Sequence, residues 1–298
     1  MTGGGAVHHL SIDIETYSDV EIGKAGLYRY AQSPAFEILL FAYSLDGSPV
    51  RVVDLAQGER VPREILSALN DPEYIKHAYN AAFEWYCLSR HLGQQLPLSQ
   101  WRCTMLHGLY CGYTAGLDAT GKALGLPQDK QKLTAGKALI KYFCVPCAPT
   151  KTNGGRTRNL PHHDPAKWEL FKTYNGQDVV TEMEIERRLA GFPVPEAVQA
   201  QWATDQIINL RGVAVDQEMV AGALELDAAV RQDYLLEATR LSGLSNPNSV
   251  AQLTKWLQEE TGEEIGDLRK NTVSDLLGKE LPSDTCLLYT SDAADDSL

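Results

Sequence analysis

Long apolar runs, a leader peptide and abundant cysteine are all missing from this sequence of 298 residues. No apolar stretch approaches the roughly 20 residues that cross a bilayer, and the opening residues MTGGGAVHHL lack the basic and apolar segments of a secretory signal. The six cysteines are dispersed, which indicates reduced thiols and not a disulfide framework. These absences predict a cytoplasmic protein without a membrane partner.

Positive charge is also scarce, because 27 basic residues face 39 acidic ones and leave a formal net charge of −12. An acidic excess of this size argues against a nucleic-acid partner. The distribution reverses that conclusion, since residues 122–158 contain eight basic residues and one acid, hence +7, and the remainder carries −19. Such segregation creates a local positive field suited to phosphates. A solvated basic surface loop is the alternative interpretation.

The first two thirds of the sequence alternate between strand and helix patterns. Apolar and polar residues alternate over 9–16, which predicts a strand. Asp164 followed by Pro165 is a strong start signal for a long helix that extends to residue 189. The other expected elements are strands at 36–45, 50–55 and 74–79, and helices after residue 62 and between residues 81 and 144. This order predicts an α/β domain over residues 1–192.

A second, mainly helical domain is expected over residues 193–285. Asp216 and the capping-box pair Ser249 and Gln252 each stand at the start of a helix pattern. Residues 286–298, CLLYTSDAADDSL, fit neither pattern and are interpreted as a non-native adapter tail. A natural disordered tail is the alternative, and neither interpretation assigns it a function.

Three Asp-x-Glu triplets occur, beginning at residues 13, 71 and 216, so the pattern by itself is unspecific. Only Asp13 and Glu15 lie inside an alternating strand, where residues two apart point to the same face. Two carboxylates on one face of a buried strand repel one another and lose hydration, and a cation between them offsets that cost. The pair therefore indicates a candidate metal site, against the alternative of a merely polar strand face.

Two further segments carry candidate site residues. Asn80 and Glu84 stand where a strand is expected to give way to a helix, and Asn80 also suits a helix cap. Tyr174 and Asp178 are four residues apart on the long helix and share one helical face. Each segment alone is weak evidence, because a capping or surface role would also explain it.

The three segments in this order match the pattern of DEDD-type 3′–5′ exonucleases: a strand with Asp-x-Glu, a helix start with Asn-x-x-Phe-Glu, and Tyr-x-x-x-Asp on a late helix. The sequence resembles the tyrosine-bearing branch, and more narrowly the exonuclease domain of bacteriophage and prophage family A DNA polymerases. The likeness extends over residues 8–192 and is carried by SIDIETYS, HAYNAAFEW, ALGLPQDKQK, GKALIKYFCVPCAPTKTNGGRTRNLP and YNGQDV. Many relatives have aspartate at the position of Glu84, and glutamate still offers oxygen ligands to a hard cation.

The resemblance implies a ribonuclease H-like mixed sheet flanked by helices, followed by a mainly α-helical partial domain that is similar to the start of a polymerase thumb. It also implies a metal-dependent hydrolase that cleaves the 3′-terminal phosphodiester of DNA with two divalent cations, Mg²⁺ or Mn²⁺. The implied catalytic metal ligands are Asp13, Glu15, Glu84 and Asp178. Tyr174 is implied to orient the attacking water. Contacts with the DNA are expected from Thr16 and Asn80 at the terminal nucleotide, and from Lys151, Arg156 and Arg158 at phosphates.

The expected partners are thus the single-stranded 3′ end of a primer and the rest of a polymerase chain, in a bacterial or phage-infected host cell. Polymerase palm motifs are absent from the sequence, so proofreading without polymerisation is expected. Two alternatives stay open: a free-standing exonuclease that acts on RNA or DNA ends, and a non-catalytic fragment that binds DNA. A zinc site at Cys144 and Cys147, completed by His162 and His163, is a minor alternative to a structural turn.

Overall fold

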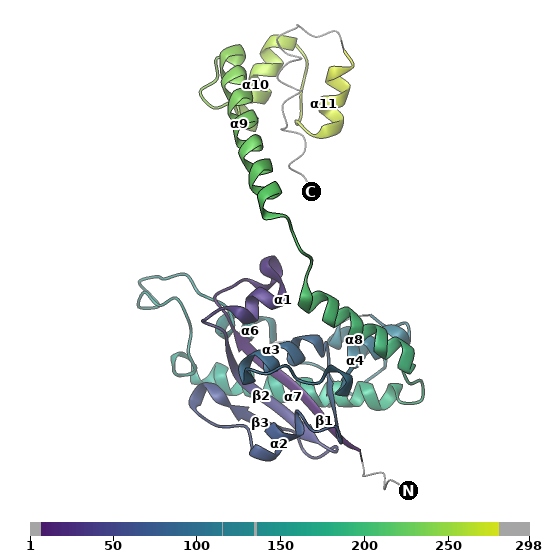
Figure 1. The fold of residues 1–298 in the computed structure, drawn as a ribbon. Coiled ribbons are helices and arrows are strands. Elements are labelled where there is room, and N and C mark those ends of the chain that lie inside the picture. Colours follow the sequence, from purple (N-terminus) through teal and green to yellow (C-terminus); the bar gives the residue numbers. More distant parts are fainter. Residues whose placement is uncertain (1–6, 115, 134–135, 280–298) are drawn as a thin grey trace. The chain divides into compact units, whose positions relative to one another are not determined.

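The computed structural model describes residues 7–114, 116–133 and 136–279, and it divides into two compact units, residues 1–212 and 213–298 (Figure 1). The expected tail at 286–298 lies outside the described residues. The division between the units falls after helix α8 (Glu196–Arg211), whereas composition placed the domain boundary near residue 192. Helix α8 therefore lies in the first unit, where Trp202 packs against the largest hydrophobic core.

A five-stranded mixed sheet with the order β3-β2-β1-β4-β5 forms the centre of the first unit. Its strands are β1 (His8–Tyr17), β2 (Glu37–Leu45), β3 (Arg51–Asp54), β4 (Tyr74–Ala78) and β5 (Trp101–Cys103). Strand β2 is antiparallel to β1 and to β3, while β4 is parallel to β1 and β5 is parallel to β4. This topology, with helices on both faces, is the ribonuclease H-like α/β fold that the sequence predicts.

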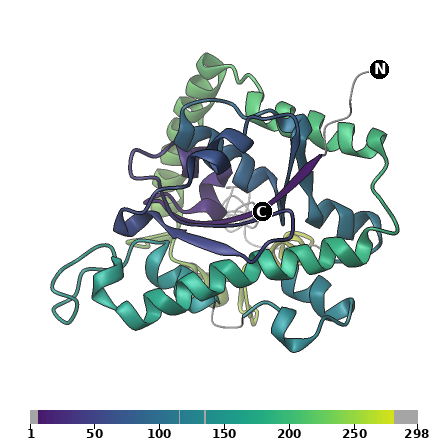
Figure 2. The ribbon, with the colours of Figure 1, turned by 90° about the horizontal axis from the view of Figure 1, so that it is seen from below.

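Helices cover both faces of this sheet, and in Figure 2 the long blue-green helix α7 runs along one face while the dark-blue helices lie on the other. Helix α7 begins where the sequence predicts, because Asp164 accepts a hydrogen bond from the backbone nitrogen of Lys167 at 3.0 Å and Pro165 occupies the first turn. The helices of the first unit that precede α8 are α1 (Ile22–Gln32), α2 (Arg63–Ala68), α3 (Ala82–Leu92), α4 (Thr104–Tyr110), α5 (Leu117–Ala123), α6 (Gly136–Phe143) and α7 (Pro165–Leu189).

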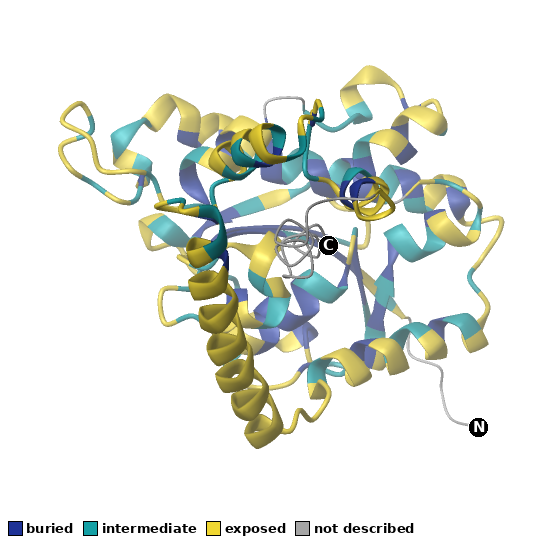
Figure 3. Ribbon diagram, turned by 90° about the horizontal axis from the view of Figure 1, so that it is seen from above, coloured by how far each residue is buried: buried dark blue, intermediate teal, exposed yellow. Residues whose placement is uncertain are grey.

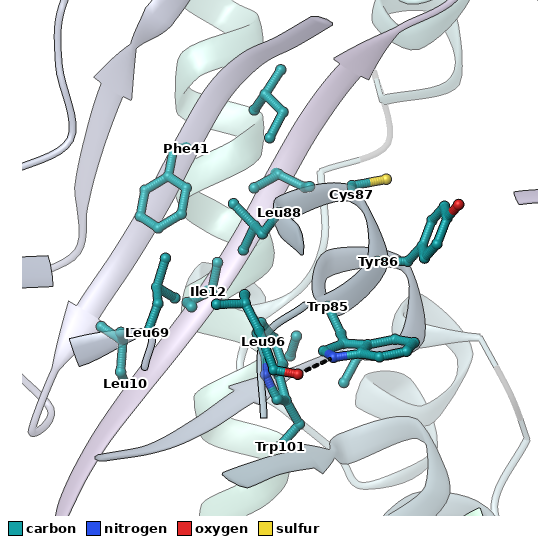
Figure 4. Packing of buried hydrophobic residues seen from close by; sticks show 14 of the residues in the cluster. Leu10, Ile12, Phe41, Leu69, Trp85, Tyr86, Cys87, Leu88, Leu96 and Trp101 are labelled. Carbon is teal, nitrogen blue, oxygen red and sulfur yellow. Dashed lines mark hydrogen bonds between the residues drawn. The ribbon is translucent and has the colours of Figure 1, made fainter. Parts of the chain in front are cut away.

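Two hydrophobic cores hold the sheet between these helices. Leu10, Ile12 and Ile14 of β1 enter the larger core together with Trp85 of α3, whose indole nitrogen donates to the carbonyl oxygen of Leu96 at 2.9 Å (Figure 4). The smaller core contains aromatic residues of α6 and α7 together with Leu39 and Leu40 of β2. Burial of large aromatic side chains of this kind typically contributes about 1.5–3 kcal/mol each. Strand β1 is thereby fixed at the centre of the unit.

The second unit is helical, as the sequence predicts, and consists of α9 (Gln217–Ser242), α10 (Val250–Thr261) and α11 (Lys270–Leu277) over its described residues. Asp216 caps α9 by accepting from the backbone nitrogens of Glu218 and Met219, which confirms the predicted start. A small core forms around Leu257, Ile265 and Leu276. Helix α9 is exposed along nearly all of its length (Figure 3). Among the described helices of both units, none is long and apolar enough to cross a membrane.

Candidate active site

Three carboxylates from two elements converge at the centre of the first unit. Asp13 and Glu15 project from the central strand β1, and Asp178 comes from the buried face of α7. Each of the three residues offers one carboxylate oxygen, and these three oxygens all lie within 4.8 Å of one another. Glu15 and Asp178 are buried and Asp13 is half-buried. Of the three Asp-x-Glu triplets, only the first enters such a group within the described residues, because residues 71–73 lie in a turn and Asp216 caps α9.

Glu84, the fourth predicted acid, lies outside the group whose oxygens are within 4.8 Å of one another. It is buried in the first turn of α3, at the point where β4 gives way to the helix. Burial, followed by the charges of Asp13 and Glu15, raises the pKa of Glu84 well above its usual range. The Glu84 carboxyl therefore interacts electrostatically with the acids of the group, most strongly with Asp13.

The donor set fits a hard divalent cation. Mg²⁺ and Mn²⁺ prefer carboxylate oxygens, and with Mg–O bonds of about 2.1 Å opposite ligands stand roughly 4.2 Å apart, so small side-chain rotations close the observed spacing. Several buried oxygens here have no hydrogen-bond partner, namely Oδ1 of Asp178 and Oε2 of Glu84 and of Glu182. Because unpaired buried oxygens are costly, a bound cation would satisfy the oxygens of Asp178 and Glu84.

Burial raises the pKa values of all three acids, and the charges of neighbouring acids add to this effect for Asp13 and Glu15. Burial is the largest cause for Asp13, followed by the charge of Asp178, and for Glu15 burial is followed by the charge of Asp13. Burial also raises the pKa of Asp178, against an opposing effect of Lys132, whose ammonium lies 2.5 Å from Oδ2. The centre thus disfavours the charged form of its acids, and one lysine offsets this effect only in part.

Tyr174 is one helical turn before Asp178 and is buried against the same region. Burial and then the charge of Asp178 raise the pKa of the tyrosine hydroxyl well above its usual value, and a hydrogen bond from Tyr174 lowers the pKa of Asp178. The ring stacks on Phe171 with a centroid distance of 6.1 Å. A Cβ atom built on Gly136, the first residue of α6, would lie 2.2 Å from Cε2 of this ring. The absence of a side chain at Gly136 is what lets the ring occupy its place.

Two site residues were missed from the sequence. Asn175 is fully buried and donates from Nδ2 to the carboxylate of Asp13 at 2.7 Å and to the backbone oxygen of Asp13 at 3.2 Å. Glu182 is buried one turn beyond Asp178, and Thr104 donates a hydrogen bond to its Oε1. A signal for Glu182 was present in the sequence, because Tyr174, Asp178 and Glu182 follow one another at the helical spacing of four.

The metal-free protein is expected to lose stability as the pH rises from about 5 to 8, and Glu182→Gln should lessen that loss. Burial raises the pKa of Glu182 to about 7, above the usual 4.5, so the folded chain holds a proton that the unfolded chain releases. Stability is then greatest below the unfolded pKa and falls as the pH passes the folded one, by up to about 3 kcal/mol for this group.

Thermal unfolding in EDTA at several pH values measures this effect. Glu182→Gln is expected to give a shallower decline than the parent and a higher midpoint at pH 8. Glu169→Gln, which changes an exposed acid on the same helix, is expected to keep the parental slope. Parallel pH profiles for the parent and Glu182→Gln would contradict the prediction.

The two residues expected at the terminal nucleotide occupy different environments. Thr16 is buried and its hydroxyl is 2.7 Å from that of Tyr30, so it is already hydrogen-bonded. Asn80 is exposed at the β4–α3 junction with φ of 71°, a left-handed conformation that asparagine tolerates better than most residues. The predicted capping by its side chain is wrong, since Ala81 is the cap position of α3 and only the backbone oxygen of Asn80 accepts, from Phe83. The exposed amide is thereby free of a capping bond.

The basic segment is tied to the first unit by some of its own charges. Arg158 lies over the ring of Tyr17 at 3.7 Å from its centroid and pairs with Glu37 at 2.5 Å. Arg156 donates to Asn159 and to the backbone oxygen of Asn153, within the same loop. Contacts of these three residues with phosphates stay a prediction. Lys151 is exposed at the turn, and of the three it is the residue least fixed by contacts within the fold.

The cysteine pair does not form a metal centre within the described residues, where the three carboxylates are the only group of at least three close ligands. Cys144 is buried and its thiol lies 3.9 Å from Oε2 of Glu15, whereas Cys147 donates to the backbone oxygen of Arg156 at 3.4 Å. The interpretation of this segment as a structural turn is therefore favoured over the zinc alternative.

Fold and site together define a ribonuclease H-like α/β unit with a buried acidic centre that can hold divalent cations. Over 268 residues, which are 90% of this chain, the sequence is 50% identical to the DNA polymerase of Bacillus phage SP02. The chain spans 41% of the length of that polymerase. It is therefore a homologue of part of a bacteriophage DNA polymerase, which confirms the predicted resemblance to a polymerase of this source.

Solved structures give weaker likenesses, and no protein-family model matches the chain. RNase D of Trypanosoma brucei has a TM-score of 0.47 at 19% identity, covering 71% of this chain and 69% of that one. The POL domain of Pol1 from M. smegmatis, in complex with DNA primer-template and dNTP, has a TM-score of 0.49 at 15% identity, covering 97% of this chain and 45% of that one. Both scores are below 0.5, so the fold assignment depends on the strand topology.

Proposed function

We propose that this chain is the 3′–5′ exonuclease portion of a bacteriophage DNA polymerase and removes nucleotides from the 3′ end of a DNA primer. The observation that carries the proposal is the convergence of Asp13, Glu15 and Asp178 within 4.8 Å, in a chain that is 50% identical to part of a phage DNA polymerase. The remainder of such a polymerase is the expected covalent partner. Residues 1–192 are proposed to form the exonuclease domain, and residues 193–285 the start of a polymerase thumb.

Hydrolysis of a phosphodiester needs an activated water and compensation of the charge that develops on the phosphate. Two divalent cations, Mg²⁺ or Mn²⁺, supply both when bound. The proposed ligands are Asp13, Glu15, Glu84 and Asp178. Asn175 fixes the carboxylate of Asp13 by its 2.7 Å hydrogen bond, and the unpaired oxygens of Glu84 and Asp178 are available for a cation.

Tyr174 is proposed to orient the attacking water without accepting its proton. The pKa of its hydroxyl is raised above the usual value by burial and by Asp178, so the hydroxyl is neutral near pH 8 and both donates and accepts hydrogen bonds. A neutral tyrosine is a poor general base at that pH. Its contribution is therefore one of position, which the packing against Phe171 and Gly136 provides.

The 3′-terminal nucleotide is proposed to lie beside Thr16 and Asn80, at the ends of β1 and β4 nearest the acids. Asn80 offers an exposed amide there, while Thr16 would have to share its hydroxyl with Tyr30. Lys151, Arg156 and Arg158 are proposed to attract the preceding phosphates through the local positive charge of their segment.

The proposal is tested by the release of mononucleotides from the 3′ end of labelled single strands. Release from DNA in Mg²⁺ or Mn²⁺, and none in EDTA, is the expected result for the parent protein. Single-stranded RNA of the same sequence serves as the comparison, and faster cleavage of RNA would favour the free-standing exonuclease over the proofreading domain. Binding of DNA without release in either metal would contradict the proposal and favour a non-catalytic fragment.

A further inference from the structure

Lys132 is the basic side chain that reaches the acidic centre. Its ammonium lies 2.5 Å from Oδ2 of Asp178 and 4.8 Å from the ring centroid of Tyr174. The side chain of Lys132 is 27% exposed, whereas that of Asp178 is 5% exposed. The lysine therefore extends from the protein surface into a largely buried site.

The segment that carries Lys132 is fastened to helix α7 beside the acid that the lysine contacts. Gln177, the residue before Asp178, donates from Nε2 to the backbone oxygens of Asp129 at 2.9 Å and of Gln131 at 3.1 Å. Gln131 is fixed in turn by a bond from its amide to the carbonyl oxygen of Leu126 at 2.8 Å. The backbone on the N-terminal side of Lys132 is thus held, and the flexible part of the arrangement is the four-carbon side chain.

The contact with Lys132 leaves much of the negative charge without compensation. The other oxygen of Asp178 has no hydrogen-bond partner, and neither has Oε2 of Glu84 or of Glu182. The lysine charge also acts favourably on Asp13 and Glu15. One ammonium therefore contacts Asp178 directly and acts through its charge on Asp13 and Glu15. These are the three acids whose oxygens are near enough to share a cation.

We infer that Lys132 is an exchangeable counter-cation of this site: its ammonium occupies Oδ2 of Asp178 and is displaced when a divalent cation engages that oxygen. The inference rests on the part of the proposed function that assigns divalent cations to the acids. A compact divalent ion carries twice the charge and binds several carboxylates at once, whereas the ammonium reaches one of them directly. Oδ1 of Asp178 has no partner, whereas Oδ2 is held by Lys132. An ion that engages Oδ2 therefore competes with the lysine for that oxygen.

The exchange of Lys132 for a divalent cation affects stability, metal affinity and contact with the substrate. Without a divalent cation, the lysine reduces the repulsion among the acids and so stabilises the folded chain. When a divalent cation binds, breaking the lysine contact weakens the apparent affinity. The released ammonium stays on a segment fastened to α7, beside Tyr174, where it can pair with a phosphate of the DNA end. Lys132 would thus act as a positioning residue that restrains the empty site and joins the substrate contacts of the loaded one.

The test is calorimetric titration of Mn²⁺ into the full chain at pH 8, without DNA, in the parent and in Lys132→Met. The variant is expected to bind Mn²⁺ on the order of tenfold more tightly, because the competing cation is gone. Its thermal midpoint in EDTA should be lower than that of the parent, and the increase on adding Mn²⁺ should be larger. Lys137→Met, at an exposed lysine of α6, is the matched control and is expected to behave as the parent.

A second variant separates charge from folding. Lys132→Arg keeps the positive charge and is expected to retain the weaker, parental affinity for Mn²⁺, which supports exchange even if Lys132→Met fails to fold. Equal or weaker binding in Lys132→Met than in the parent, or tighter binding in Lys132→Arg, would overturn the inference while leaving the metal site intact. A parent protein that binds no Mn²⁺ would overturn the metal site of the proposed function and the inference with it.

Discussion

Asp13→Ala is expected to slow release of the 3′-terminal nucleotide about a thousandfold, the largest effect of any single substitution considered. Asp13 is the acid through which the others are linked, since its charge raises the pKa of both Glu15 and Glu84 and its oxygens belong to the close group with Asp178. Loss of one metal ligand removes several kcal/mol of transition-state stabilisation, and each 1.36 kcal/mol is a factor of ten in rate.

The measurement is single-turnover cleavage of a 3′-labelled DNA single strand in Mg²⁺. The matched control is Glu73→Ala, which alters an exposed acid of the second Asp-x-Glu triplet and should keep the parental rate. Circular dichroism establishes that both variants are folded. Removal of Asp13 is even expected to raise the thermal midpoint in EDTA, because it relieves repulsion among buried acids. A rate for Asp13→Ala near that of the parent would remove the proposed chemistry.

Gly136→Ala should lower the cleavage rate about a hundredfold although residue 136 has no side chain to take part in chemistry. The added methyl group would lie 2.2 Å from Cε2 and 2.5 Å from Cζ of Tyr174. Both distances are shorter than any van der Waals contact between carbon atoms, so the ring or the start of α6 has to move. A displacement of about 1 Å of a group that positions a reactant costs on the order of a hundredfold in rate. Overpacking of the core should also destabilise the fold by about 1–3 kcal/mol.

Gly23→Ala is the control for this substitution, because Gly23 lies in helix α1 with nothing within 4 Å of the added atom. It is expected to leave the rate unchanged and not to lower stability, because alanine favours a helix more than glycine does. Tyr174→Phe provides a second comparison, since it removes the hydroxyl and keeps the ring in place. If Gly136→Ala cleaved as fast as the parent, the position of the tyrosine ring would be irrelevant to the reaction.

Most of the secondary structure could be predicted from local patterns. The long helix at 165–189 matches α7 at both ends, because an Asp-Pro start is a local signal. Strands β1 to β4 also appear where alternation and apolar runs place them. The elements that were missed are α1, β5 and α11. Strand β5 has only three residues, and Gly26 interrupts α1 with φ of 77°, so neither produces a periodic pattern of useful length.

The candidate site was predicted less completely than the fold. Asp13 with Glu15, and Tyr174 with Asp178, share a face as their local spacings indicated, and the fold brings the two pairs together. Glu84 interacts with the charges of Asp13 and Glu15 but stands outside the closest group. Lys132 was counted only as one charge of a basic segment. The sequence does not indicate which lysine of that segment reaches the acids.

The amino-acid sequence by itself determined which side chains share a face of one element, because the periods of strand and helix are properties of the backbone. Asp13 with Glu15, and Tyr174 with Asp178, are pairs of this kind. The tertiary structure alone decided the contacts between distant segments: Asn175 with Asp13 across 162 positions, Lys132 with Asp178 across 46, and Gly136 against the ring of Tyr174. These contacts depend on how helices pack on the sheet, and the packing is set by the shapes of many side chains together, which no local pattern contains.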